Sequence, residues 1–182
     1  MCIKKEIIKL LFVLIVPFSL SATELDYSVG LTVSKYDNLN LEPNPTQGGV
    51  SESIVGGIIL AEDTANLVAN IDASLQLINY DDNQTQDESI GHLVANALWV
   101  LSPGHYEWFF SDTYTQTLVD SFDGDTPANR QNVNAFSTGP NIAFKIDSTN
   151  NFNIEARVET ISFENNQSVI DADNDRVELT AG

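Results

Sequence analysis

Few residues of this chain have the types and spacing that catalysis or metal binding requires. His92 and His105 are its only histidines, and neither belongs to a His-Glu-x-x-His zinc motif. The chain has no glycine-rich phosphate loop, and the sequence disfavours a serine–histidine–carboxylate triad. The only cysteine, Cys2, lies in the N-terminal leader described below. We therefore expect no catalytic residue, no cofactor and no metal, and no enzymatic activity.

The segment from Asp171 to Asp175 begins like a calcium-binding loop, because aspartates occupy its first, third and fifth positions. Such a loop needs glycine at its sixth position and glutamate at its twelfth. Arg176 and Gly182 stand there instead. The sequence therefore argues against specific calcium binding.

Polar side chains recur at every other position in two stretches, which is the period of a β-strand. They alternate with alanine, leucine, isoleucine and valine, so each stretch has one polar and one apolar face. The polar members are Asn70, Asp72, Ser74, Gln76, Glu155, Arg157 and Glu159. They could form a selectivity surface for a solute, or a packed polar interior that stiffens the protein. We favour the packed interior, in which Arg157 would pair with an acid.

A third group is rich in hydrogen-bond donors and consists of Asn129, Arg130, Asn132 and Asn134. Such side chains could bind sugar hydroxyls, or they could order the connection that precedes them by bonding to its backbone. We favour the ordering role. Gly139-Pro140 follows inside a strand pattern and predicts a bulge or a bend, since proline cannot donate to the ladder.

The elements that must hold these residues are strands, because period-two alternation dominates and helical periodicity is nearly absent. Eight strands are expected, several of them longer than the about 5–6 residues usual in soluble proteins. Their ranges are 25–36, 50–60, 66–80, 89–101, 106–118, 132–146, 152–163 and 176–181. The connections between them alternate long and short, as in a membrane barrel with long outer loops and short periplasmic turns.

One aromatic face leaves an alternative open. Tyr106, Trp108, Phe110 and Tyr114 share it and would suit a membrane-interface girdle, but Asp112 shares it too. Either a bulge turns Asp112 away from lipid, or this face lines the interior.

Residues 1–22 resemble a secretory signal peptide, with Lys4, Lys5 and Lys9 before an apolar run that is too short to span a membrane. Cleavage after Ser21 or Ala22 would remove Cys2 with it. The domain expected at 23–182 is a single barrel. The whole chain has 8 basic and 26 acidic residues, so losing three lysines and Glu6 gives 5 − 25 = −20, which argues against nucleic-acid binding.

Most of the acidic side chains fall in the expected long loops. They are Asp37, Glu42, Asp81, Asp82, Asp87, Glu88, Asp120, Asp123, Asp125, Glu164, Asp171, Asp173 and Asp175. They could bridge to lipopolysaccharide through divalent cations, or they could simply be solvated. We favour simple solvation.

The stretch from Asp125 to Lys145 resembles a motif, roughly T-P-x-N-R-x-N-V-N-x-F-S-T-G-P, of outer-membrane β-barrel proteins associated with exosortase and exopolysaccharide systems. The matching residues are Thr126, Pro127, Asn129, Arg130, Asn132, Val133, Asn134, Phe136, Ser137, Thr138, Gly139 and Pro140. Tyr36-Asp37-Asn38 and the series Trp108, Asp112, Gln116 are also similar to that family. The resemblance implies a barrel in the outer membrane and a link to polysaccharide export, and it implies no catalytic set.

Family members are generally longer, and their chains usually end on an aromatic-terminated strand, whereas this chain stops at Glu178-Leu-Thr-Ala-Gly182. We therefore expect an N-terminal fragment of a barrel with at least eight strands. The leading function is a structural or porin-like conduit in the outer membrane of a Gram-negative bacterium, with membrane lipid, polysaccharide and export machinery as partners. The alternatives are a surface-exposed binding protein or adhesin that uses the acidic loops, and, least favoured, an outer-membrane lipid hydrolase.

Overall fold

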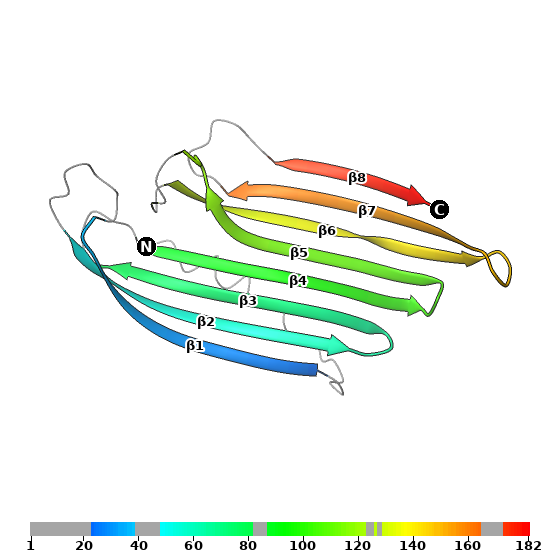
Figure 1. The fold of residues 1–182 in the computed structure, drawn as a ribbon, viewed down its shortest axis with the longest axis horizontal. Helices are drawn as coiled ribbons and strands as arrows, with labels where there is room; N and C mark the ends of the chain where they lie inside the picture. Colours follow the sequence, from blue (N-terminus) through cyan, green and yellow to red (C-terminus); the bar gives the residue numbers. More distant parts are fainter. Residues whose placement is uncertain (1–22, 39–47, 82–86, 123–125, 127–128, 165–172) are drawn as a thin grey trace, which may run out of the picture.

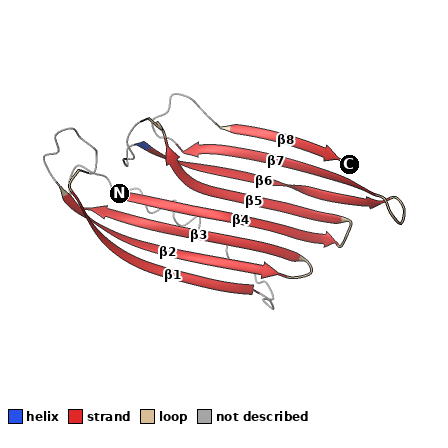
Figure 2. Ribbon diagram, in the orientation of Figure 1, coloured by secondary structure: helices blue, strands red, loops and turns tan. Residues whose placement is uncertain are grey.

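The computed structural model describes residues 23–38, 48–81, 87–122, 126, 129–164 and 173–182. They form one antiparallel sheet of eight strands that follow one another in sequence order (Figure 1). Every long element is a strand, as Figure 2 shows. The leader predicted at 1–22, residue Pro127 of the motif, and the loop acids Glu42, Asp82, Asp123, Asp125 and Asp171 lie outside the described residues.

The predicted strands are confirmed, with small shifts at their ends. The strands are β1 Thr23–Tyr36, β2 Gly49–Asp63, β3 Leu67–Tyr80, β4 Glu88–Ser102, β5 Tyr106–Leu118, β6 Arg130–Lys145, β7 Asn151–Glu164 and β8 Asn174–Ala181. Seven of them have 13 to 16 residues, and only β8 is short, with 8. The all-β, up-and-down architecture is therefore observed.

The sheet is open. Strands β1 and β8 form its two edges, and within the described part of the chain they do not pair with each other (Figure 1). The short turns 64–66, 103–105 and 146–150 lie at one end of the sheet, and the longer connections lie at the other. This separation follows from the meander, because successive connections alternate between the two ends of the strands.

The short turns are held by local interactions. Thr64 Oγ1 and the Leu67 backbone exchange hydrogen bonds of 3.1 Å, and Gly104 has a φ of 71°, which favours glycine. The Asp147 carboxylate accepts bonds from the backbone N–H groups of Thr149 and Asn150. These contacts explain why three, three and five residues suffice to reverse the chain.

The described residues form a single layer, and none of them makes a second layer against the sheet. Among the described residues Ala69 is the only buried hydrophobic residue, and Asn129 is the only buried polar one. Soluble domains bury one face of each sheet against another layer. The described residues contain no helix that is long and apolar enough to cross a membrane. What covers the sheet must therefore come from outside this single layer.

The two faces differ in chemistry. We call the side that carries Leu67, Ala69, Ile71, Ala73, Leu75 and Leu77 of β3 the apolar face, and the opposite side the polar face. Residues paired directly across an antiparallel sheet point the same way. By this rule the apolar face includes Leu25 to Val33 of β1 at alternate positions, Trp99 of β4 and Val177 and Leu179 of β8. The predicted alternation in β3 and β7 is confirmed.

The strands are staggered as well as paired. The row of direct partners that starts at Leu25, near the beginning of β1, reaches Asp112 in the middle of β5. In Figure 1 each successive short turn lies farther along the sheet. The sheet is therefore a parallelogram, not a rectangle.

Candidate functional site

The polar face is the candidate site, and it holds the two predicted polar groups. Asn70, Asp72, Ser74 and Gln76 of β3 lie opposite Asn96, Val94, His92 and Ile90 of β4. Glu155, Arg157 and Glu159 of β7 lie on the same face, but β4, β5 and β6 separate them from β3. The structure thus places both groups on one surface without bringing them together.

The β3 group is mostly solvated. Asn70 and Asp72 are exposed, while Gln76 Nε2 donates to Ser53 Oγ of β2 at 3.2 Å. Ser111 Oγ of β5 donates to Asn96 Oδ1 of β4 at 2.9 Å on the same face. Short polar side chains therefore link adjacent strands, which suits a polar lining better than a ligand site.

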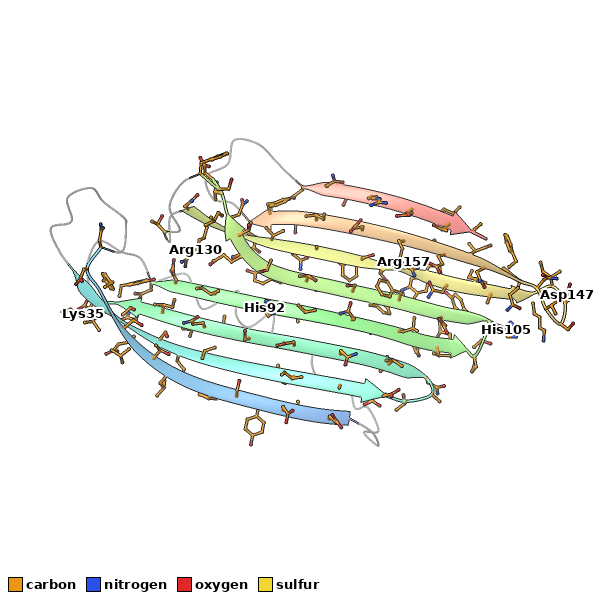
Figure 3. All side chains as sticks on the ribbon, in the orientation of Figure 1. Lys35, His92, His105, Arg130, Asp147 and Arg157 are labelled. Carbon is orange, nitrogen blue, oxygen red and sulfur yellow. The ribbon has the colours of Figure 1, made fainter. Side chains whose placement is uncertain are left out.

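Arg157 is the most connected side chain of the polar face. Its Nη1 donates to the carbonyl oxygens of Ala156 at 2.8 Å and Pro140 at 3.2 Å. Its Nη2 donates to Asn141 Oδ1 at 2.5 Å, and its guanidinium carbon lies 4.7 Å from the centre of the Phe109 ring. The side chain therefore joins β5, β6 and β7 (Figure 3).

The expected acid partner of Arg157 is present but weak. Glu155 Oε2 lies 3.7 Å from Nη2, and its side chain is 57% exposed. An exposed ion pair contributes little. The main partners are neutral carbonyl and amide oxygens, which the sequence analysis missed because they depend on the pairing of β6 with β7.

Gly139 and Pro140 interrupt the ladder between β6 and β7. Thr138 pairs with Val158 and Asn141 pairs with Glu155, so three residues advance on each strand and no extra residue is inserted. The interruption is a bend and not a one-residue bulge. A Cβ at Gly139 would lie 1.9 Å from the Ala156 oxygen. Glycine is therefore required, and Arg157 satisfies the two carbonyls that the ladder leaves free.

The predicted donor group does not form one cluster. Asn129 is buried and orders the β5–β6 connection: its Oδ1 accepts from the Asp120 N–H and its Nδ2 donates to the Asp120 carbonyl, both at 2.8 Å. Arg130 Nη1 lies 3.3 Å from Glu88 Oε2, which also accepts from the Tyr80 hydroxyl. Of the predicted group, Asn129 thus has the ordering role that we favoured, whereas Arg130 pairs with an acid of β4.

The remaining two asparagines lie on the apolar face, near the longer connections. Asn134 Nδ2 donates to Asp112 Oδ1 at 2.7 Å, and Asn132 Nδ2 donates to Glu164 Oε2 at 3.3 Å. The register between β5 and β6 is unbroken at Asp112, so no bulge turns this residue away. Asp112 therefore stays on the same face as the aromatic side chains, where its carboxylate is bonded to the Asn134 amide. The sequence alone could not show this contact, because it depends on the register between β5 and β6.

Aromatic side chains gather on the apolar face at the short-turn end. Trp99 pairs directly with Trp108, and the Tyr106 and Trp108 rings meet edge to face with centroids 6.4 Å apart. Trp108 Nε1 donates to Thr138 Oγ1 at 2.8 Å, so its polar atom is satisfied within the sheet. The Asp112–Asn134 pair lies on the same face, farther from the short turns than this aromatic group.

The two histidines lie far apart in the sheet. His92 is exposed on the polar face, and His105 lies in the β4–β5 turn with Nδ1 3.3 Å from the Ala143 oxygen. A shallow hollow beside that turn is lined by His105, Glu107, Asn141 and Glu155. The described residues contain no group of three potential metal ligands.

Three described acids near the longer connections accept hydrogen bonds from the backbone of a facing strand. Asp81 Oδ1 accepts from the Val50 N–H at 2.8 Å, and Asp173 Oδ1 accepts from the Phe163 N–H at 2.8 Å. Asp87 accepts from both the side chain of Asn79 and the N–H of Tyr80. These three acids therefore fasten neighbouring strands where the longer connections begin, a role that neither interpretation of the acidic loops had foreseen.

Comparison of this chain with protein families, curated proteins and solved structures found no match in any of the three.

Proposed function

We propose that this chain is an outer-membrane β-barrel protein of a Gram-negative bacterium, with a structural or conduit role in exopolysaccharide export. One observation carries the proposal: seven strands of 13 to 16 residues form a single layer, and none of the described residues covers its apolar face. Leu31 is 79% exposed and Leu179 is 73% exposed on that face. Lipid would remove these side chains from water, at about 25 cal/mol per Å² of apolar surface.

The strand lengths support a membrane span. Fourteen residues at about 3.3 Å each give roughly 46 Å, and a tilt of about 40° leaves about 35 Å along the membrane normal. The apolar band of such barrels is about 25 Å tall. Strands this long therefore cross the band and extend beyond it at both ends.

The apolar face also changes character where a bilayer would end. Toward the longer connections it becomes polar at one position in every strand. These positions are Lys35, Glu52, Asn79, Ser89, Gln116, Asn134, Thr160 and Asp175. Toward the short turns it carries Trp99, Tyr106 and Trp108, the residue types found in interfacial girdles. Asp112 lies midway along β5, inside this face, where its carboxylate accepts a hydrogen bond from the Asn134 amide.

The export role rests on different support. The residues from Thr126 to Pro140 resemble the motif of barrels associated with exopolysaccharide systems, and the polar face would form the interior. The described acids near the longer connections give no specific support to the adhesin alternative, because Asp81, Asp87 and Asp173 accept hydrogen bonds from the backbone of a facing strand. The proposed export role therefore depends on the resemblance of this motif.

Tryptophan quenching by brominated lipids tests the membrane assignment. Trp99 and Trp108 are the only tryptophans, and both lie on the apolar face. We expect strong quenching of the reconstituted protein, greatest with bromines near the headgroups. The control is a Trp99→Phe/Trp108→Phe/Val94→Trp variant, whose single tryptophan lies on the polar face and should be shielded. Equal quenching of both proteins, or a monomer that is soluble without detergent, contradicts the assignment.

Planar-bilayer recording then separates the two roles. Stable single-channel steps from the inserted protein support a conduit. Insertion without steps supports a structural role.

A further inference from the structure

We infer that β8 closes the sheet onto β1 of the same chain, in the antiparallel register that sets Asp175 opposite Lys35. This inference rests on the proposed membrane barrel and adds the identity and register of the closing pair. It replaces the expectation of a fragment of a longer barrel with eight strands that close by themselves, and the cross-linking experiment below tests this choice. With eight strands in an up-and-down order, β1 and β8 run in opposite directions. Their free edges can therefore form an ordinary antiparallel ladder without a crossover.

The register follows from a row of direct partners that crosses the whole sheet. The row runs from Leu25 through Leu60, Ile71, Ala95, Asp112, Phe136 and Thr160 to Asp175. On β8 the apolar face becomes polar at Asp175, and on β1 it becomes polar at Lys35. Lys35 lies 35 − 25 = 10 residues along β1 from the start of that row. A continuous apolar band therefore requires a stagger of ten residues at closure.

The side chains match in that register. Asp175 meets Lys35, Val177 meets Val33, Leu179 meets Leu31 and Ala181 meets Val29. All eight are exposed, and among the described residues neither Lys35 nor Asp175 forms an ion pair. On the polar face Arg176 would lie opposite Ser34 and Glu178 opposite Thr32. Opposite charges and apolar pairs directly across an antiparallel ladder are both stabilising.

Other registers fit less well. An odd stagger would put the apolar side of β8 on the polar side of β1, since successive side chains alternate. A stagger of eight sets Asp175 opposite Val33, inside the apolar band. A stagger of twelve sets Asp175 opposite Asp37, a pair of like charges. Of these values, a stagger of ten sets the opposite charges of Asp175 and Lys35 together and also keeps the apolar band continuous.

Barrel geometry is compatible with a stagger of ten, which falls in the middle of the observed range. For eight strands about 4.8 Å apart and a rise of about 3.3 Å per residue, a stagger of ten gives a strand tilt of about 41° and a radius of about 8 Å. Observed tilts are about 35–45°. Eight strands leave an interior that side chains fill. Closure in this register therefore favours the structural role over an open conduit.

Cysteine cross-linking tests the register directly. In the full chain carrying Cys2→Ser, Leu31→Cys is combined in turn with Val177→Cys, Leu179→Cys or Ala181→Cys, which report staggers of eight, ten and twelve. After reconstitution and mild oxidation, we expect intramolecular cross-linking of the Leu31–Leu179 pair at least tenfold faster than of the other two pairs. In this register residues Thr23 to Ser28 extend past the end of β8. The cysteine on β1 is therefore placed at Leu31, within the part of β1 that β8 pairs with.

Each outcome decides something. Fastest cross-linking through residue 177 or 181 overturns the register. Cross-links that form mainly between two chains overturn closure within one chain. If none of the pairs cross-links while Trp99 and Trp108 are quenched by brominated lipid, closure is wrong and the membrane assignment stands. If quenching fails as well, the proposed function falls with it.

Discussion

Replacing Gly139 with alanine probes the point where the β6–β7 ladder is interrupted. The added Cβ would lie 1.9 Å from the Ala156 carbonyl oxygen and 2.8 Å from the Ala156 carbonyl carbon. Real contacts of this kind are not shorter than 3.0 Å, so the backbone of β7 must retreat by 3.0 − 1.9 = 1.1 Å. Both clashing atoms are backbone, and no side-chain rotation can relieve them.

The retreat also breaks the bonds that replace the ladder. The Ala156 oxygen accepts from Arg157 Nη1 at 2.8 Å, and the guanidinium reaches Phe109 across the space where Gly139 has no side chain. Overpacking costs about 1–3 kcal/mol, and a hydrogen bond to a charged group contributes about 1.5–3 kcal/mol. Because the two effects overlap, we expect Gly139→Ala to lower the free energy of unfolding by about 3 kcal/mol.

Gly56→Ala is the matched control. Gly56 is also a strand glycine, but a Cβ there meets nothing within 4 Å. This change should be neutral or stabilising by up to about 1 kcal/mol, since alanine restricts the unfolded chain. Urea titration of the reconstituted protein, followed by tryptophan fluorescence, measures both variants. Trp108 is well placed as a reporter because it pairs directly with Pro140.

A double-mutant cycle sharpens the test. Arg157→Ala alone removes the guanidinium bonds, and in Gly139→Ala much of that loss has already occurred. We therefore expect the two changes to be less than additive by at least about 1 kcal/mol. Equal stability of Gly139→Ala and Gly56→Ala, or strict additivity with Arg157→Ala, would refute this account of the bend.

Three further predictions concern connections and turns. Asn129→Ala should lower the free energy of unfolding by about 1–3 kcal/mol and speed proteolysis within 119–129, whereas Asn151→Ala, at an exposed strand end, should do neither. Gly104→Ala should cost about 1 kcal/mol because φ is 71°, and Gly104→Asn should cost less, as measured by urea titration. Hydrogen bonds from the Asn150 side chain, then from Thr149, lower the pKa of Asp147 to about 2, so the stabilisation is complete above the ordinary value of 3.8 and is lost as pH falls toward 2. NMR of the 146–150 turn should follow that loss in the wild type, and Asp147→Ala should lack it.

The strands could be predicted from the sequence because each carries its own signal. Period-two alternation in β3 and β7 and the turn residues between strands are local properties, and they located all eight elements within a few residues. The separation of long and short connections then followed from strand order alone. Strand ends shifted slightly, as at Arg130, because ladder bonds extend past the alternating residues.

The contacts of the site depend on register, which the sequence does not show. Arg157 was expected to meet an acid, yet its closest partners are the carbonyl of Ala156 in its own strand and the carbonyl of Pro140 in the neighbouring strand. Asp112 could be placed only when its neighbour Asn134 was known. The backbone-bonding role of Asn129 could be predicted, because an asparagine side chain beside a long connection can bond to the backbone of that connection whatever its conformation.

The order of the strands in the sheet also bears on the order in which the ladders form during folding. Each hairpin from β1–β2 to β7–β8 joins segments that are adjacent in the chain, so order can grow one strand at a time. The inferred seam between Leu31 and Leu179 is different, because it must tether segments 179 − 31 = 148 residues apart. The last ladder to form would thus be the one that seals the molecule, and the earlier hairpins shorten the effective loop that it has to close.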